Sequence, residues 1–233
     1  MKIGGSPRLR PPVARPGQIL CLARNYAAHA AETSGAPPTE PIYFAKSPRA
    51  VIGQEEPVIY PAGAERIDPE VELAVVIGRR CRKVRREEAL EYVAGYTILN
   101  DITDRHQQQL DIQAKQPWYR SKSYDTFCPM GPVLVLTDEI PDPQALELTL
   151  RVNGEVRQHA STSEMLFPVA QIIEAISQHI TLEPGDVIAT GTPQGIAPIR
   201  PGDVVECDIP GIGKLRNPVV EEKAPATASP SGS

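Results

Sequence analysis

Short apolar runs separated by proline, glycine and charged turns recur along the chain. The run from Asp68 to Gly78 alternates at its start between charged and apolar residues. In an extended strand, residues two apart point to the same face, so Glu70 and Glu72 are expected side by side opposite Val71 and Leu73. A second apolar run, 96–100, ends at Asp101. The pattern therefore predicts two strands that carry three carboxylates.

The remaining apolar pattern predicts further strands and few helices. Asn153-Gly154 predicts a type I′ hairpin turn between two of the strands. Many short strands and few helices predict an α+β fold, mainly β and centred on antiparallel sheet. The strands are expected at 18–23, 41–46, 58–60, 131–136, 146–152, 155–157, 187–189 and 204–206, the helices at 26–33, 87–93 and 169–179, and a helix or loop at 104–115.

Length and composition limit the class of protein. A chain of 233 residues with 25 prolines forms one domain, or one domain with a small appendage. The formal net charge of −5 gives no electrostatic case for nucleic acid. No apolar run approaches the ~18 residues that span a bilayer, and 1–20 has no signal-peptide core. The scattered cysteines fit reduced, mostly buried thiols, and we expect a cytoplasmic protein.

The chain ends are expected to differ from the middle. Residues 1–17 are basic and proline-rich, which predicts an irregular segment. From 222 to 233, Ala, Pro, Ser, Thr and Gly dominate, which predicts a disordered tail. The catalytic domain is therefore expected to span 18–221.

Glu70, Glu72 and Asp101 are a candidate metal site. Three hard oxygen ligands on rigid backbone, with the other positions left to water or substrate, suit Mg²⁺ or Mn²⁺. The alternative interpretation of the two glutamates is the solvated face of an edge strand. The six basic residues between 79 and 86 form either an anion-binding patch or, as the pattern favours, a solvated turn paired with the acids of the next helix.

His29 and Glu32 lie three apart on a predicted helix of about two turns, so they share a face. The helix is expected to be capped by Asn25 and is too short to be stable alone. An imidazole next to a carboxylate can serve general acid–base catalysis, and a marginal helix between glycine and proline residues is typical of a lid. An exposed helix pair is the alternative.

Two further segments are candidates for substrate binding. Lys122 could hold a substrate carboxylate or stabilise negative charge near the metal, or it could be an ordinary surface lysine. The loop Gly191–Pro198 lacks the Gly-Lys-Ser/Thr ending of a phosphate-binding loop. Its backbone N–H groups and the Thr192 hydroxyl could cup an anion.

From about Ile19 to Val220, the chain resembles the fumarylacetoacetate hydrolase family. It is similar to the short bacterial branch, which includes acylpyruvases, oxaloacetate decarboxylases and 2-hydroxyhepta-2,4-diene-1,7-dioate isomerases. The resemblance rests on five motifs that follow the family's order: Arg24-Asn25-Tyr26-Ala27-Ala28-His29, Glu70-Val71-Glu72-Leu73, Gly95-Tyr96 through Asp101, Arg120-Ser121-Lys122-Ser123 and Gly191-Thr192-Pro193-Gln194-Gly195.

The resemblance implies a mixed, mainly β sandwich roll, a homodimer and a role for each motif. Glu70, Glu72 and Asp101 would bind Mg²⁺ or Mn²⁺, Lys122 would support the active centre, and His29 and Glu32 would form a catalytic pair on the lid, at about 25–34. The residues implied to contact the substrate are Arg24, Lys46, Arg105, Gln108 and Thr192.

A 2-oxo acid can chelate one metal ion, which then stabilises an enolate at the oxo group. Proton abstraction to form that enolate and return of the proton give tautomerisation or a double-bond shift. Loss of CO₂ gives decarboxylation, and attack by water at a distal carbonyl expels the enolate and cleaves a C–C bond. We therefore expect a metal-dependent enzyme that acts on 2-oxo or 2-hydroxydienoic acids, as in the breakdown of aromatic compounds. The run 122–132 most resembles 2-hydroxyhepta-2,4-diene-1,7-dioate isomerases. Acylpyruvate hydrolase and oxaloacetate decarboxylase or tautomerase are the alternatives, and a catalytically silent metabolite-binding protein is a distant one.

Overall fold

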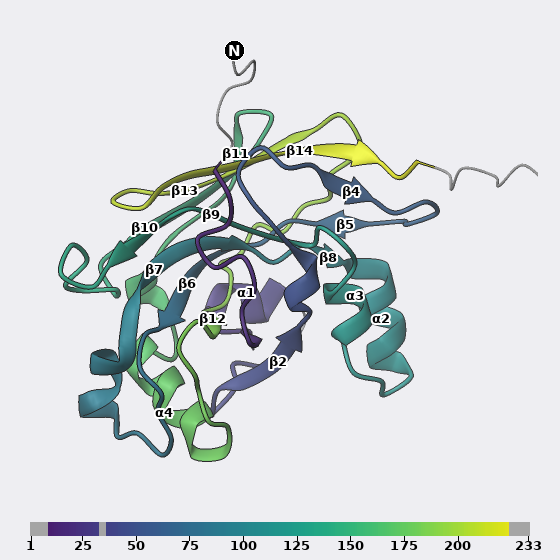
Figure 1. The fold of residues 1–233 in the computed structure, drawn as a ribbon. Helices are drawn as coiled ribbons and strands as arrows, with labels where there is room; N and C mark the ends of the chain where they lie inside the picture. Colours follow the sequence, from purple (N-terminus) through teal and green to yellow (C-terminus); the bar gives the residue numbers. More distant parts are fainter. Residues whose placement is uncertain (1–8, 33–35, 224–233) are drawn as a thin grey trace, which may run out of the picture.

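Two packed β-sheets form the centre of the computed structural model, which describes residues 9–32 and 36–223 (Figure 1). The larger sheet has seven strands in the order β2-β1-β12-β6-β7-β9-β3. Its strands are β1 (Ile19–Ala23), β2 (Ile42–Lys46), β3 (Val51–Ile52), β6 (Val71–Ile77), β7 (Val93–Asn100), β9 (Cys128–Leu136) and β12 (Val187–Ala189).

The smaller sheet has five strands in the order β11-β10-β13-β14-β4 and covers one face of the larger one (Figure 1). A short two-stranded ladder, β5-β8, lies beside them. These strands are β4 (Val58–Tyr60), β5 (Ile67–Asp68), β8 (Thr103–Asp104), β10 (Glu147–Val152), β11 (Glu155–Ser161), β13 (Val204–Ile209) and β14 (Gly213–Glu221).

The pairing is mixed, as the predicted fold class requires. Most neighbours are antiparallel, whereas β1 pairs with β12, β4 with β14 and β3 with β9 in parallel. The expected α+β, mainly β sandwich roll is confirmed. The hairpin at Asn153-Gly154 is also confirmed, because both residues have the positive φ, 52° and 85°, that a type I′ turn needs. The pattern predicted the first half of β13 and missed all of β14.

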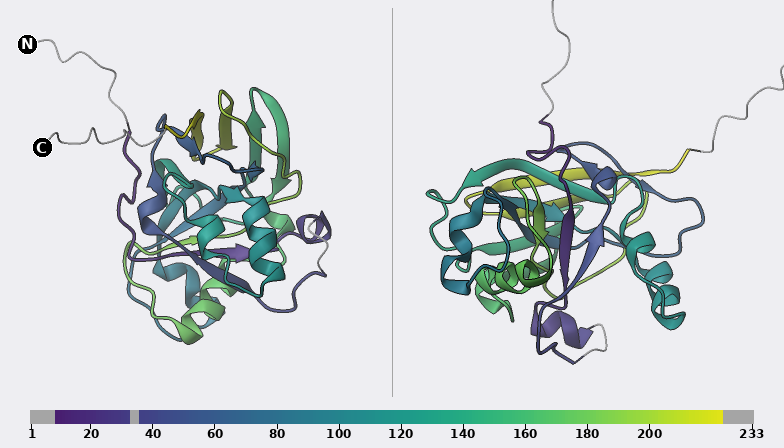
Figure 2. Two further views of the ribbon diagram at one scale, coloured as in Figure 1. Left: turned by 90° about the vertical axis from the view of Figure 1, so that its right-hand side faces the viewer. Right: turned by 60° about the horizontal axis from the view of Figure 1, so that its bottom comes forward.

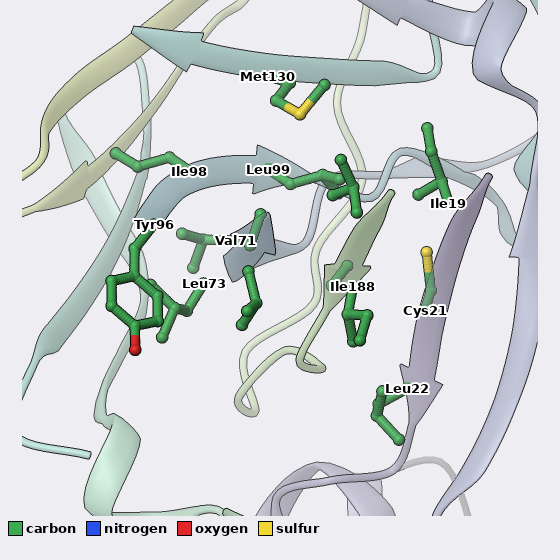
Figure 3. Close-up of a cluster of buried hydrophobic side chains, with 14 of the residues drawn as sticks. Ile19, Cys21, Leu22, Val71, Leu73, Tyr96, Ile98, Leu99, Met130 and Ile188 are labelled. Carbon is green, nitrogen blue, oxygen red and sulfur yellow. The ribbon is translucent and has the colours of Figure 1, made fainter. Parts of the chain in front are cut away.

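Strand β6 lies at the centre of the core, not at an edge. It pairs with β12 on one side and with β7 on the other, and each of its residues is buried. Apolar residues at successive positions, such as Val75 and Val76, fill both faces, which is the pattern of a strand covered on both sides. Figure 3 shows Val71 and Leu73 of this strand among side chains from neighbouring strands. The edge-strand alternative for the two glutamates is therefore wrong.

The helices lie at the two ends of the larger sheet and over its middle. In the right-hand view of Figure 2, α2 and α3 lie at one end and α4 at the other, with α1 between them. The helix α4 packs against the 3-10 helix η2. The helix predicted at 87–93 is this 3-10 helix. The bounds are α1 (Ala27–Glu32), η1 (Pro48–Ala50), η2 (Arg86–Tyr92), α2 (Arg105–Gln113), α3 (Tyr119–Lys122), η3 (Thr162–Glu164) and α4 (Val169–His179).

Other local predictions have mixed outcomes. The basic turn pairs with acids, as in Arg79–Glu91 and Arg85–Glu88, and the cysteines are free and buried. Asn25 does not cap α1, because its side chain bonds the backbone of Phe167 and of Thr190 instead. None of the described helices is long and apolar enough to cross a membrane. Residues 1–8, 33–35 and 224–233 lie outside the described residues. They include most of the predicted tail, about half of the predicted irregular N-terminal segment and the end of the predicted lid.

Candidate active site

Three carboxylates meet where β6 begins and β7 ends. The antiparallel register pairs Val71 with Asn100, so the start of β6 lies beside Asp101, and the Asp101 N–H donates to the Glu70 carbonyl at 2.8 Å. One oxygen each of Glu70, Glu72 and Asp101 lies within 4.8 Å of the others, and all three residues are buried. The structure thus brings together the three predicted metal ligands.

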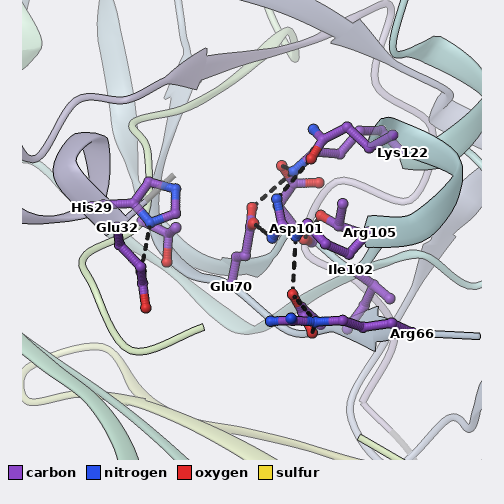
Figure 4. A network of polar contacts seen from close by, with 12 residues as sticks. His29, Glu32, Arg66, Glu70, Asp101, Ile102, Arg105 and Lys122 are labelled. Atoms are coloured by element: carbon purple, nitrogen blue, oxygen red, sulfur yellow. Dashed lines mark hydrogen bonds and ion pairs between the residues drawn. The ribbon is translucent and has the colours of Figure 1, made fainter. Parts of the chain in front are cut away.

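Buried cations surround two of these carboxylates (Figure 4). The Lys122 ammonium bridges them, donating to Glu70 Oε2 at 2.8 Å and to Asp101 Oδ2 at 2.6 Å. Lys46 donates to Asp101 Oδ1 at 2.6 Å, and the Arg105 guanidinium bonds Glu70 Oε1. Every carboxylate oxygen of Glu70 and Asp101 therefore accepts a charge-assisted hydrogen bond.

The pKa of Glu70 shows which effect dominates in this cluster. Burial raises the pKa of this carboxyl, but Lys122 and Arg105 together outweigh burial and hold it well below its usual range. For Lys122, burial acts to lower the pKa of the ammonium, and the charges of Asp101 and Glu70 raise it overall. Glu70 and Lys122 thus stay ionised as a pair inside the protein.

Glu72 differs from its two neighbours because no cation bonds to it among the described residues. Its Oε2 accepts the Gly191 N–H at 2.7 Å. Burial, followed by the charges of Asp101 and Glu70, raises the pKa of Glu72 well above its usual value. The cluster lacks positive charge at this carboxylate.

The buried charged groups of the site, taken together, also lack one positive charge. Four carboxylates face three cations, so the ionised cluster has one negative charge in excess. An all-oxygen donor set with excess negative charge fits a hard divalent cation such as Mg²⁺ or Mn²⁺. The groups counted are Asp68, Glu70, Glu72 and Asp101 against Lys46, Arg105 and Lys122.

The cluster opens into a cavity of about 400 Å³ between α1, α2 and the strand ends. One part of its wall is apolar, where the rings of Phe44 and Trp118 meet edge to face at 5.7 Å. Another part is polar and cationic. The lining residues are Leu22, Ala23, Arg24, His29, Glu32, Phe44, Arg66, Glu70, Glu72, Arg105, Gln108, Gln109, Ile112, Trp118, Lys122, Thr192 and Ile196.

His29 and Glu32 face this cavity from α1. His29 Nδ1 and Glu32 Oε2 are 3.2 Å apart, as the helical spacing predicts. Figure 4 shows the pair on the opposite side of Glu70 from Lys122. The pair and the carboxylate cluster therefore border one space, so a pair that could transfer a proton and a cluster that could hold a metal can contact the same small molecule.

The loop Gly191–Pro198 contacts the glutamates of the site. The Gly191 N–H donates to Glu72, and the Gly195 N–H donates to both oxygens of Glu32 at 3.1 and 3.2 Å. The Thr192 hydroxyl donates to the Val71 carbonyl at 3.0 Å. The predicted anion cup needs correction, because in this structure these donors bind acceptors of the protein itself.

The residues implied to contact substrate separate into two groups. Arg24, Arg105, Gln108 and Thr192 line the cavity. Lys46 does not line it and is 1% exposed, and its ammonium bonds Asp101 and the carbonyls of Ile102 and Lys122. In this structure Lys46 therefore holds Asp101 in place from the protein interior, away from the cavity.

Two residues of the site, Asp68 and Arg66, were not predicted from the sequence. Asp68 is fully buried and accepts from Arg105 Nε at 2.9 Å, and Arg66 lies beside it and lines the cavity. A signal for both was present, because charged residues alternate with uncharged ones from Arg66 to Glu72. The period of two places these side chains on one side of an extended chain.

Known proteins resemble this chain in sequence and in fold. Residues 18–220 match the family model of the fumarylacetoacetate hydrolase C-terminal domain. The crystal structure of 2-hydroxyhepta-2,4-diene-1,7-dioate isomerase from Mycobacterium marinum is similar, with 43% identity and a TM-score of 0.82 over 92% of this chain and 78% of that one.

Two relatives with named activities are similar in sequence. A mitochondrial oxaloacetate tautomerase of Bos taurus is 42% identical over 90% of this chain and 68% of its own length. A 2,4-didehydro-3-deoxy-L-rhamnonate hydrolase of a Sphingomonas species is 42% identical over 94% of this chain and 79% of its own length. From the extent of the family match and these identities, the chain belongs to the fumarylacetoacetate hydrolase family of enzymes.

Proposed function

We propose that this protein is a divalent-metal-dependent enzyme that acts on 2-oxo or 2-hydroxydienoic acids, most like a 2-hydroxyhepta-2,4-diene-1,7-dioate isomerase. One observation carries the proposal: a buried all-oxygen cluster and a histidine–glutamate pair border the same cavity. The name of the Mycobacterium marinum structure supports the isomerase assignment.

Glu70, Glu72 and Asp101 would hold Mg²⁺ or Mn²⁺. When bound, the cation would act as a Lewis acid that polarises the 2-oxo acid and stabilises its enolate. The chain supplies the remaining positive charge near the substrate through Lys122, which stays ionised beside Glu70 and Asp101. Removing Lys122 would leave both carboxylates without their shared partner.

The cavity wall would bind and orient the substrate carboxylate. Arg24 makes no hydrogen bond with its side chain to any residue that the structure describes, so its guanidinium is available. Its backbone has a positive φ of 57°, which is uncommon for a residue other than glycine and occurs often in functional segments. Gln108 uses its Oε1 to accept from Arg105, which leaves its amide N–H groups for a ligand.

Glu32 and His29 would move the proton. In this structure the Gly195 N–H and the His29 ring fix the Glu32 carboxylate at the mouth of the cavity. Closing α1 over a substrate would exclude water from the carboxylate. Glu32 would then take the proton from the substrate carbon, and His29 would orient the carboxylate and share the proton.

The alternatives use the same first steps. An acylpyruvate-type C–C hydrolase would use Glu32 to activate water, and an oxaloacetate decarboxylase or tautomerase would need only the enolate and a proton donor. The named tautomerase and hydrolase relatives favour keeping both as candidates. A silent metabolite-binding protein would not need the His29–Glu32 pair that borders the cavity.

The test is a panel of 2-hydroxyhepta-2,4-diene-1,7-dioate, acetylpyruvate and oxaloacetate with Mg²⁺ or Mn²⁺. Glu32→Gln should lower kcat by about 10²-fold, a typical general-base contribution. It should leave oxalate binding to the manganese-loaded protein nearly unchanged, since Glu32 is not a metal ligand in the proposal.

Glu147→Gln is the matched control. Glu147 also faces a histidine, His159 at 3.7 Å, but this pair is exposed and outside the cavity. The control should keep full activity. If Glu32→Gln keeps full kcat on each substrate, or if it loses oxalate binding as strongly as turnover, the proposed role of Glu32 is wrong.

A further inference from the structure

Arg66 holds a guanidinium at the cavity wall that the proposed chemistry does not use. Its Nε donates to Asp68 at 2.9 and 3.2 Å, and its side chain is 43% exposed. Within the described residues, its two terminal nitrogens have no hydrogen-bond partner. Figure 4 shows the side chain of Arg66 running beside the network, on the same side as Arg105.

Asp68 has a buried partner besides Arg66. Arg105 donates to Asp68 from its Nε at 2.9 Å and also contacts Glu70. Arg66 adds a fourth cation to the four carboxylates of the network from its open end. It contacts Asp68 through Nε, which leaves both of its terminal nitrogens for another acceptor.

The position of Arg66 is fixed by its backbone as well as by Asp68. Its carbonyl accepts the N–H of Arg105, the first residue of α2, at 2.8 Å. Asp68 lies between Arg66 and Arg105, and Arg105 in turn contacts Glu70. Arg66 is thus connected to Glu70 of the carboxylate cluster through three successive ion pairs, and it lies on the cavity wall.

The wall shared with Arg66 can accommodate a carbon chain. The rings of Phe44 and Trp118 and the side chain of Ile112 line the same cavity and are apolar. A ligand whose 2-oxo acid end sits at the carboxylate cluster would lay its chain along such a surface. Arg66 lines the same cavity, so a second acidic group of such a ligand would have its free nitrogens as a partner.

We infer that Arg66 is the specificity residue that binds the second, distal carboxylate of a dicarboxylic 2-oxo acid. A planar guanidinium with two free terminal nitrogens matches a carboxylate. The inference rests on the proposed function, because it places the first carboxylate and the oxo group at the cluster.

Binding of matched ligands to the manganese-loaded protein tests this by titration calorimetry. The two ligands, 2-oxoadipate and 2-oxohexanoate, have the same chain length and differ in the distal carboxylate. The wild type should bind 2-oxoadipate about tenfold more tightly, which corresponds to about 1.4 kcal/mol. Arg66→Met should remove this preference and Arg66→Lys should restore part of it, because a lysine keeps the charge without the planar fork.

Oxalate, which has no chain, separates the possible outcomes. Arg66→Met should leave oxalate affinity unchanged, as should Arg49→Met, which removes an exposed arginine outside the cavity. If oxalate binding falls as much as 2-oxoadipate binding, Arg66 acts through Asp68 or on the first carboxylate, and the inference is overturned.

The remaining outcomes separate the two proposals. If oxalate binds but the wild type does not distinguish 2-oxoadipate from 2-oxohexanoate, the distal site alone is wrong. If neither oxalate nor any 2-oxo acid binds, the proposed function fails, and the distal site fails with it.

Discussion

Substituting Lys46 by Met tests whether this residue supports Asp101 or contacts substrate. The Lys46 ammonium donates to Asp101 Oδ1 at 2.6 Å, to the Ile102 carbonyl at 3.1 Å and to the Lys122 carbonyl. It is 1% exposed. Methionine has a similar length and adapts its shape to the site, so the change removes the charge and the donors while filling most of the space.

The structure gives the expected size of the effect. Removing one partner of a buried ion pair costs about 3–5 kcal/mol, because the remaining charge stays buried without compensation. Each carbonyl left without a donor adds about 1–3 kcal/mol at most. Lys122 still contacts the other oxygen of Asp101 at 2.6 Å, which limits the loss. We expect the free energy of unfolding to fall by about 4 kcal/mol, a large part of the 5–15 kcal/mol typical of a domain.

The assay is urea unfolding of the metal-free protein, followed by circular dichroism, for the wild type and the variant. The double variant Lys46→Met/Asp101→Asn should recover part of the loss, since it removes the buried charge that the single change leaves unpaired. Lys214→Met is the control, because Lys214 pairs with Glu206 and Asp208 at the surface and should change stability little. If Lys46→Met unfolds at the wild-type urea concentration and raises KM for 2-oxo acids, Lys46 contacts substrate and the structural interpretation is wrong.

Three further predictions concern the metal, the loop and assembly. Because the pKa of Glu72 is raised in the fold, its contribution to metal-free stability is present below about pH 4.3 and is lost as the pH rises through the raised pKa. Glu72→Gln should therefore stabilise the metal-free protein at high pH while weakening Mn²⁺ binding in calorimetry, and equal Mn²⁺ affinity would contradict the ligand assignment. Gly195→Ala should lower the unfolding temperature and activity together, because a Cβ would lie 2.0 Å from the Arg157 carbonyl at a φ of +101°; wild-type values for both would refute the tight approach. We expect a homodimer in light scattering at micromolar concentration, since Val133 and Leu136 of β9 are exposed apolar residues that a partner could cover, and a monomer would count against it.

The sequence by itself determined the local structure and the residue types of the candidate site. The period of two in the run from Asp68 to Gly78 and the Asn-Gly turn each depend only on neighbouring residues, and both are present in the structure. The spacing of three between His29 and Glu32 likewise places the two side chains within 3.2 Å. The ordered motifs also identified the family, which the comparisons confirm.

The surroundings of each group were decided by the tertiary structure. Nothing near Glu72 in the sequence indicates that it lacks a cation while Glu70 has two, because Lys122 and Arg105 come from distant segments. Lys46 looks like any lysine at the end of a strand until the fold buries it against Asp101.

Asn25 shows the same limit in a single residue. In the sequence it stands where a helix cap is expected, but the fold brings the Phe167 and Thr190 backbones within reach of its side chain. Buried backbone groups need hydrogen-bond partners. The fully buried Asn25 amide supplies them to two distant segments, at Phe167 and Thr190, and not to the helix. Pattern and propensity act over a few residues, whereas charge compensation and hydrogen-bond satisfaction depend on which segments the fold brings together.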